Sequence, residues 1–218
     1  MRPTFHVIGD RGLLVKYGNS IDIEINKKVR SIAASIRRHR GVVEAVPAYC
    51  SITILYNPIL IKAHELKDYV SKLKPTDVDS TERTIIVPVC YDGDFGPDIR
   101  EVASLHGIST GDLVQIHSEA KYYVYMLGFT PGFPFLGGLP EILITPRRSV
   151  PRKSVPAGSV GIGGQQTGIY SIKSPGGWQI IGRTPLKLFN PYGSNPCLFR
   201  TGDYLKFKPI SRREYEGF

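Results

Sequence analysis

The stretch that decides the fold runs from Tyr122 to Phe189 and contains three motifs rich in glycine, proline and aromatic residues. They are YYVYMLGFTPGFPFLGGLP (Tyr122–Pro140), TPRRSVPRKSVPAGSVGIGGQQTGIY (Thr145–Tyr170) and SPGGWQIIGRTPLKLF (Ser174–Phe189). Twelve of the chain's 23 glycines and eight of its 17 prolines lie in this stretch, so its aromatic side chains stand beside turns. Short strands joined by tight Gly- and Pro-containing corners indicate a β-barrel or a sandwich.

The same region has an unusual charge pattern. From Ile142 to Gly202 there is no Asp or Glu, whereas basic residues stand at Arg147, Arg148, Arg152, Lys153, Lys173, Arg183, Lys187 and Arg200. Arginine forks bind carboxylate or phosphate bidentately, and the prolines around the first three arginines restrict the backbone that carries them. An ordinary barrel with tight corners explains the glycines and prolines, but the missing acids favour an anion pocket.

We therefore expect one pocket in the second half of the chain that offers a cation, an amide, an imidazole and an aromatic face. The candidate substrate-binding residues are His117, Arg147, Arg152, Gln166 and Trp178, although His117 is equally compatible with an ordinary surface position. Backbone around the pocket would come from Gly163, Gly164, Gly168, Gly176 and Gly177. Phe133 and Phe135 stand on Gly/Pro loops where burial within one barrel is difficult, so we expect a partner protein to cover them. The sequence assigns no catalytic residue.

Other motifs in the region do not support common catalytic sites. The run Gly161–Gly168 lacks the Lys-Ser/Thr of a phosphate-binding P-loop and the glycine pattern of a dinucleotide site, and Tyr170–Lys173 after it predicts a strand. Its backbone N–H groups remain compatible with an anion-binding loop. Ser159 lacks the strand–turn–helix context of a nucleophile elbow. The five histidines and three cysteines show no metal-ligand spacing, so we expect no metal site in the chain itself.

The first 80 residues alternate between strand and helix patterns. Apolar spacing predicts strands at Gly12–Tyr17, Val42–Val46 and Ser51–Tyr56. It predicts helices at Ile25–Ile36 and Ala63–Leu73. Such pairs of strands separated by helices suggest a βαβ-βαβ sandwich of the ferredoxin-like kind. The polar segment Pro75–Thr81 is a plausible linker.

The linker divides the chain into expected domains at 1–80 and 81–218, an α+β organisation. After a strand at Arg83–Cys90, the pattern predicts a helix over Gly96–His106 and a shorter one over Thr110–Ala120. From Tyr122 to the end we expect only strand and loop.

Composition limits the possible partners. The net charge of +9 is divided as +5 over residues 1–80 and +4 over 81–218, an even spread that argues against nucleic-acid binding. The three cysteines are widely separated, which favours a reducing cytoplasm over a disulfide framework. The sequence shows no signal-peptide pattern and no long apolar run, so we expect a soluble cytoplasmic protein without a membrane partner.

Four motifs resemble the allophanate hydrolase subunit 1 family, which includes Kip-type kinase inhibitors and the B subunit of ATP-dependent 5-oxoprolinase. They are GFTPGFPFLGGLP, TPRRSVPRKSVPAGSVGIGG, QTGIY and SPGGWQIIGRTP, and they occur in order between Gly128 and Pro185. GDRGLLVKYG (Gly9–Gly18) and PVCYDGDFGPDI (Pro88–Ile99) extend the resemblance over the whole chain.

The resemblance implies a small ferredoxin-like α/β sandwich domain followed by a cyclophilin-like β-barrel domain. It also implies a hydrolase component, inactive alone, that opens 5-oxo-L-proline to L-glutamate with subunits A and C. ATP with Mg²⁺ would be the cofactor, at a site completed by the C subunit because the chain has no convincing ATP loop. The alternative is a Kip-type inhibitor that binds a histidine kinase and performs no chemistry.

Overall fold

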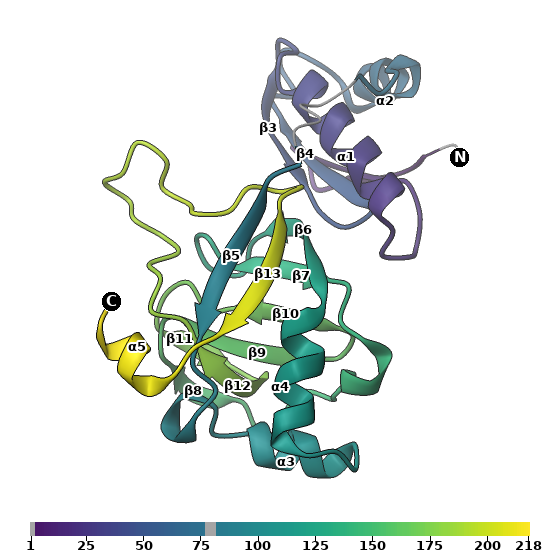
Figure 1. The fold of residues 1–218 in the computed structure, drawn as a ribbon. Helices are drawn as coiled ribbons and strands as arrows, with labels where there is room; N and C mark the ends of the chain where they lie inside the picture. The colour runs from purple at the N-terminus through teal and green to yellow at the C-terminus, as the bar shows by residue number, and fades with distance from the viewer. Residues whose placement is uncertain (1–2, 77–81) are drawn as a thin grey trace. The chain divides into compact units, whose positions relative to one another are not determined.

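The computed structural model describes residues 3–76 and 82–218, which form two compact units, Met1–Thr81 and Glu82–Phe218 (Figure 1). Residues 77–81 of the expected linker lie outside the described residues. Each unit has its own core of buried aliphatic and aromatic side chains. Among the described residues, no helix has both the length and the apolar character needed to cross a membrane.

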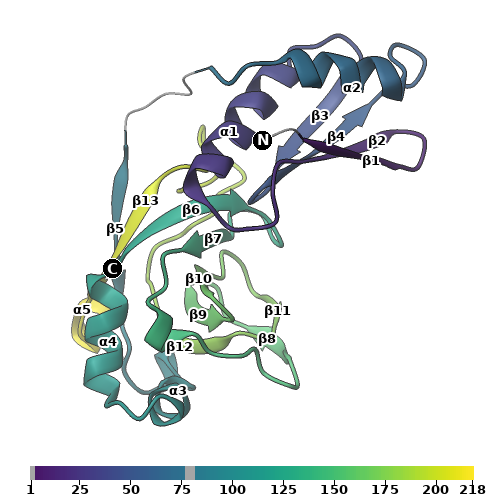
Figure 2. The same cartoon turned by 90° about the vertical axis from the view of Figure 1, so that its right-hand side faces the viewer.

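The first unit is a four-stranded antiparallel sheet, in the order β1-β2-β4-β3, with two helices. Its elements are β1 (Thr4–Ile8), β2 (Gly12–Lys16), α1 (Ile23–Ile36), β3 (Val42–Pro47), β4 (Ser51–Tyr56) and α2 (Ala63–Lys72). Buried residues of α1 and α2 pack against the alternate residues of the sheet that face one side, such as Leu13, Val15, Ile52 and Ile54. Both helices therefore cover the same face of this sheet, as Figure 2 shows.

Strand β1 is absent from the sequence expectation. It pairs with β2 at Phe5↔Val15 and His6↔Leu14, yet only Phe5 of its five residues is partly buried, packed against the core of the first unit. An edge strand with so little buried surface has no clear apolar alternation, and backbone pairing alone places it in the sheet.

The second unit is built on a seven-stranded sheet in the order β12-β9-β10-β7-β6-β13-β5. Its strands are β5 (Thr84–Val89), β6 (Lys121–Leu127), β7 (Pro134–Gly137), β9 (Ser159–Gly163), β10 (Gln166–Ile169), β12 (Gln179–Arg183) and β13 (Tyr204–Pro209). Cys90 and Arg183 exchange two backbone hydrogen bonds of 2.9 Å, which join the two edges of the sheet. The sheet is thus a nearly closed barrel, and a separate two-stranded sheet pairs β8 (Arg152–Val155) with β11 (Ser174–Gly176).

The second unit differs from the sequence-based expectations at three places. The expected helix over Gly96–His106 is shorter, because Asp98 donates its backbone N–H to Ile180 O and α3 starts only at Ile99 (Ile99–Leu105). The C-terminal part is not only strand and loop, because the Ser211/Glu214 capping box starts α5 (Arg212–Glu216). Tyr170–Lys173 is not a strand, since the chain bends after β10. Helix α4 (Thr110–Glu119) and two 3₁₀ turns, η1 (Gly93–Phe95) and η2 (Glu141–Leu143), complete the unit.

Candidate functional site

A buried carboxylate organises the part of the barrel where the arginines gather. The side chain of Asp98, just before α3, is 4% exposed. Its Oδ1 lies 2.5 Å from Arg152 Nη2 and 3.2 Å from Arg148 Nη1, and its Oδ2 accepts a 2.6 Å hydrogen bond from the backbone N–H of Ile180. One negative charge therefore faces two guanidinium groups, which leaves a positive excess.

Two aromatic residues adjoin these charges. The guanidinium carbon of Arg147 is 5.8 Å from the centroid of the Trp178 ring, a cation–π distance. Burial raises the pKa of the Tyr170 hydroxyl, while its hydrogen bond to the backbone of Trp178 and the charges of Arg147 and Arg152 oppose that rise. We call the set that these contacts link the arginine cluster: Asp98, Arg147, Arg148, Arg152, Tyr170 and Trp178.

Backbone pairing holds the Pro-spaced arginine segment beside Trp178. The N–H of Arg148 donates to Gly177 O at 2.8 Å, and Arg152 pairs with Gly176 where β8 meets β11. The arginine segment therefore runs antiparallel to the SPGGW motif. This pairing brings Arg147, Arg148 and Arg152 to the region of Trp178. The sequence argument from proline restriction is consistent with this placement.

The glycines of this region are needed because aromatic rings pack directly on their backbone. A Cβ added at Gly163 would be 2.6 Å from Trp178 Nε1, one at Gly168 would be 2.9 Å from Trp178 Cζ3, and one at Gly176 would be 2.2 Å from Tyr170 Oη. Gly164, at φ +64°, forms the turn between β9 and β10. These glycines shape a platform for the two rings of the arginine cluster.

Gly163→Ala is expected to lower the free energy of unfolding by about 1–3 kcal/mol, because the new methyl group overpacks against the indole. Trp178 is the one tryptophan of the chain, so its fluorescence reports both the unfolding transition and the displacement of the ring. Gly111→Ala in the first turn of α4 is the matched control, since its Cβ would meet only Ser109 Oγ at 3.6 Å. Equal stability of both variants would contradict the packing argument.

The arginine cluster retains unused hydrogen-bond donors. Arg148 Nε and Arg152 Nη1 are buried nitrogen atoms with no hydrogen-bond partner among the described residues. Buried donors without partners are uncommon and costly, and cationic donors bind anionic oxygens best. These two donors are therefore of the kind that pairs with a carboxylate or a phosphate oxygen.

The structure does not bring His117 into this cluster. His117 is fully buried in α4, its Nδ1 is 2.9 Å from Tyr91 Oη, and its Nε2 is 3.1 Å from Thr167 Oγ1. Its ring stacks on Phe207 at 4.5 Å, and burial lowers the pKa of the imidazole to about 3. The position is neither a surface nor a pocket wall, because the helix turns this side chain into the barrel core.

The glycine run is a hairpin and not an anion loop. Gln166 pairs with Gly163, and Gly168 pairs with Gly161, where β9 meets β10. The antiparallel ladder uses backbone N–H groups that the loop interpretation assigned to an anion. Gln166 is partly buried at the start of β10 and has partners of its own.

The expectation that Phe133 is difficult to bury in its own domain is wrong. Its side chain is 2% exposed and packs edge-on against Tyr170 and Trp178, at centroid distances of 5.2 and 5.5 Å. Phe135 is partly buried beside the same rings. The exposed aromatic of this loop is Phe129, at 63%, whose φ of +61° makes it the one non-glycine residue with positive φ in the described part of the chain.

Sequence reasoning missed Asp98 and Tyr170 as members of the cluster, and it counted Arg148 among the Pro-spaced arginines without placing it in the list of candidate substrate-binding residues. Asp98 lies some fifty residues before the arginines that it binds (|i−j| of 50 and 54). No local signal in the sequence links Asp98 to these arginines; the acid-free arginine segment indicated only that a counter-charge had to come from elsewhere in the chain.

Comparison with known proteins agrees with this architecture. The family described as carboxyltransferase domain, subdomain C and D, matches residues 3–199. The chain is 40% identical to the 5-oxoprolinase B subunit of Bacillus subtilis (strain 168), over 100% of this chain and 97% of that protein. It is 42% identical to the 5-oxoprolinase B subunit of Escherichia coli O157:H7, over 95% of this chain and 96% of that protein.

Solved structures share the fold. The TTHA0988 structure superimposes with a TM-score of 0.83 at 35% identity, covering 92% of this chain, which spans only 40% of that chain. The conserved uncharacterized protein PH0987 from Pyrococcus horikoshii has 46% identity and a TM-score of 0.60, covering 97% of this chain and 100% of that one. The match of the family to most of the sequence, together with relatives above 40% identity, shows that the chain belongs to the carboxyltransferase-domain family, subdomain C and D.

Proposed function

We propose that the chain is the B subunit of an ATP-dependent 5-oxoprolinase complex, which hydrolyses 5-oxo-L-proline to L-glutamate. The observation that carries the proposal is the arginine cluster, with its positive excess and its unpartnered donors at Arg148 Nε and Arg152 Nη1. 5-Oxoproline is a small anion, and curated relatives at 40–42% identity carry the name of the 5-oxoprolinase B subunit.

The cluster's chemistry suits that substrate. A planar guanidinium can take a carboxylate bidentately, and the cation–π contact with Trp178 holds the Arg147 guanidinium in place. Three arginines against the single carboxylate of Asp98 also suit negative charge that grows during the reaction. In this proposal Arg147, Arg152 and Trp178 contact substrate, Gln166 adjoins them at the start of β10, and His117 in the barrel core takes no part.

ATP is proposed to bind at a site that the C subunit completes. The arginine cluster suits a phosphate as well as a carboxylate. However, residues 3–76 and 82–218 contain no group of three or more His, Cys, Asp or Glu side chains that could hold Mg²⁺. In this proposal Mg²⁺ enters with the nucleotide, held mainly by its phosphates.

The partners in this proposal are subunits C and A. The chain is 28% identical to a segment of the urea amidolyase of Lachancea kluyveri and spans 14% of that protein, so a related segment occurs there within a much longer chain. Exposed Phe129, on the loop between β6 and β7, is the aromatic contact we propose for a partner. The same exposed ring supports the second candidate, a Kip-type inhibitor that docks on a histidine kinase.

We also propose specific domain types. The proposed domain of residues 1–80 contains β2, α1 and β3, with β4 hydrogen-bonded between the parallel strands β2 and β3. This split β-α-β arrangement supports a ferredoxin-like domain. The nearly closed barrel of residues 81–218 supports a cyclophilin-like domain.

The test is 5-oxoproline-dependent ATP hydrolysis by the complex reconstituted with subunits A and C. Arg147→Ala is expected to lower kcat/KM about tenfold to a hundredfold, because one charged hydrogen bond contributes roughly 1.5–3 kcal/mol. Lys187→Ala, another basic residue of the acid-free stretch, is the matched control and should retain activity. Full activity of a folded Arg147→Ala complex would place the substrate elsewhere. If the variant loses kinase binding but no hydrolysis, the inhibitor function is the correct one.

A further inference from the structure

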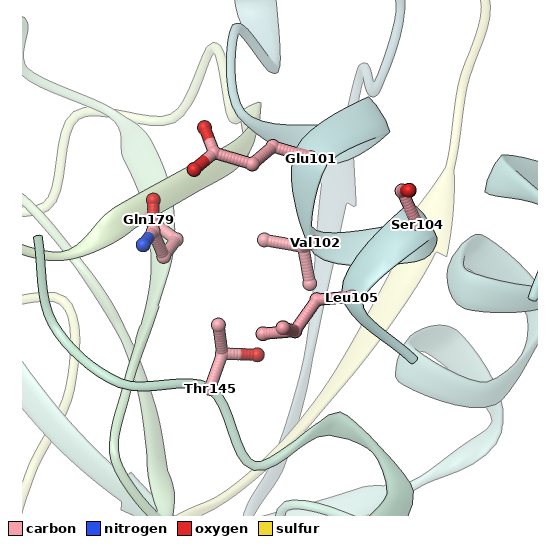
Figure 3. Close-up of a pocket in the computed structure, with 6 residues that line it drawn as sticks. All are labelled: Glu101, Val102, Ser104, Leu105, Thr145 and Gln179. Atoms are coloured by element: carbon pink, nitrogen blue, oxygen red, sulfur yellow. The ribbon is translucent and has the colours of Figure 1, made fainter. Parts of the chain in front are cut away.

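A pocket lies outside the arginine cluster, between α3 and the strand β12. Its volume is about 300 Å³, and Figure 3 shows the residues that line it: Glu101, Val102, Ser104, Leu105, Thr145 and Gln179. Helix α3 contributes four of these side chains, and the other two come from the opposite wall. None of the six belongs to the arginine cluster.

Gln179 gives this pocket an unsatisfied acceptor. The residue is 8% exposed, and its Nε2 donates to Pro146 O at 3.2 Å, which directs the amide oxygen away from that carbonyl. Oε1 is buried and has no hydrogen-bond partner in the described part of the chain. A buried amide oxygen of this kind requires a donor, which a ligand can supply.

The other polar groups of the pocket add acceptors and few donors. Glu101 contributes a carboxylate, which Figure 3 shows on the same side of the pocket as the Gln179 amide. The Thr145 hydroxyl already donates to Leu143 O at 2.9 Å and lies 3.0 Å from His106 Nε2, so it has no proton left to offer. Val102 and Leu105 make the remaining wall apolar.

We propose that this pocket binds a primary ammonium group carried on a short aliphatic skeleton. Such a cation donates three hydrogen bonds, pairs with the Glu101 carboxylate and supplies the donor that Gln179 Oε1 lacks, while its carbon chain contacts Val102 and Leu105. A neutral alcohol or amide of the same size would not gain the ion pair.

The identity of the natural ligand rests on the proposed function. Hydrolysis of the lactam breaks its C–N bond; water supplies hydroxyl to the carbonyl carbon and hydrogen to the nitrogen, and the free amine takes a further proton at neutral pH. The product thus acquires an ammonium group that the substrate lacks. Gln179 lies in sequence between Trp178 of the arginine cluster and Ile180, which binds Asp98, so the pocket adjoins the anion site through β12. It is a product-ammonium subsite.

The experiment is an NMR titration of the ¹⁵N-labelled full chain with n-propylammonium chloride, against n-propanol and 2-pyrrolidone at constant ionic strength. We expect saturable shifts of the backbone amides of Val102, Thr145 and Gln179 with propylammonium, and affinities at least about tenfold weaker for both neutral probes. Glu101→Gln should weaken propylammonium binding by a similar factor. Glu119→Gln, which removes an exposed carboxylate of α4, should leave it unchanged.

Equal binding of the three probes, or binding that Glu101→Gln leaves unaltered, would overturn the proposal. Propylammonium is not a substrate, so this result is independent of the ATP hydrolysis assay. A final pair of titrations uses L-glutamate and glutarate, which differ in the ammonium group. Tighter binding of L-glutamate that disappears in Glu101→Gln supports the product subsite, and no difference between the two dicarboxylates rejects it.

Discussion

Asp98→Ala is expected to lower the free energy of unfolding of the second unit by about 3–5 kcal/mol, because it removes a buried carboxylate and leaves two partly buried guanidinium groups without their counter-charge. Asp98 Oδ1 contacts Arg148 and Arg152, and Oδ2 accepts from the backbone of Ile180, so one substitution removes three interactions. The loss should also disorder the arginine segment. Activity of the reconstituted complex would then fall together with stability.

Urea unfolding followed by Trp178 fluorescence measures this effect, because Trp178 lies in the second unit and is 6% exposed. Asp98→Asn keeps an oxygen acceptor for Ile180 and should lower the free energy of unfolding less than Asp98→Ala does. The difference between the two variants separates the contribution of the hydrogen bond from that of the charge. In a double-mutant cycle, Arg152→Met should lower the free energy of unfolding less in the Asp98→Ala background than in the wild type. A loss below about 1 kcal/mol in Asp98→Ala would show that the carboxylate is not the organising group.

Acidification from pH 7 to pH 5 is expected to lower the free energy of unfolding by about 2 kcal/mol through His117 alone. Burial lowers the pKa of this imidazole from 6.5 to about 3 in the folded protein. Below pH 6.5 His117 therefore becomes protonated in the unfolded chain but stays neutral in the folded chain. This contribution to stability is fully present above pH 6.5 and is lost progressively as the pH falls toward 3.

The imidazole ¹⁵N resonances of His117 give the direct measurement, and they should remain those of a neutral ring at pH 5. His117→Gln should remove this part of the pH dependence. Tyr91→Phe loses the 2.9 Å contact to Nδ1 but keeps the histidine and hence the dependence, which guards against a glutamine variant that does not fold. His64→Gln, on exposed α2 surface, should change neither stability nor its slope with pH. Protonation of folded His117 near pH 6.5 would contradict the prediction.

Local sequence determined most of the regular elements. Helix α1 follows from its apolar spacing, and its first turn is capped by Asp22, whose Oδ1 accepts from Ile25 N at 2.9 Å. The barrel strands follow from apolar runs between Gly and Pro corners, as the first motif Tyr122–Pro140 shows. These signals act within a few residues, because periodicity and turn preference are properties of neighbouring positions. The capping box of α5 was equally local, in Ser211 and Glu214, although the β-rich context hid it.

The types of residue in the candidate site could also be predicted, but the sequence did not identify every residue that forms it. The acid-free segment indicated arginines and Trp178 together, and the structure places Arg147 over that ring. His117 appeared to be available for the same pocket, yet α4 turns it into the core against Phe207. The direction of a side chain on a helix depends on which face the rest of the fold buries.

Only the tertiary structure decided where the charges are paired and where the aromatics are buried. Asp98 meets Arg152 across a sequence separation of 54 residues, and Phe133 is covered by Tyr170 and Trp178 from segments later in the chain. Glycines that looked like an anion loop instead carry those rings, because a Cβ at Gly163 or Gly168 would collide with the indole. The physical reason is that packing and charge compensation depend on distances between segments far apart in the chain, whereas sequence patterns record only what neighbouring residues prefer.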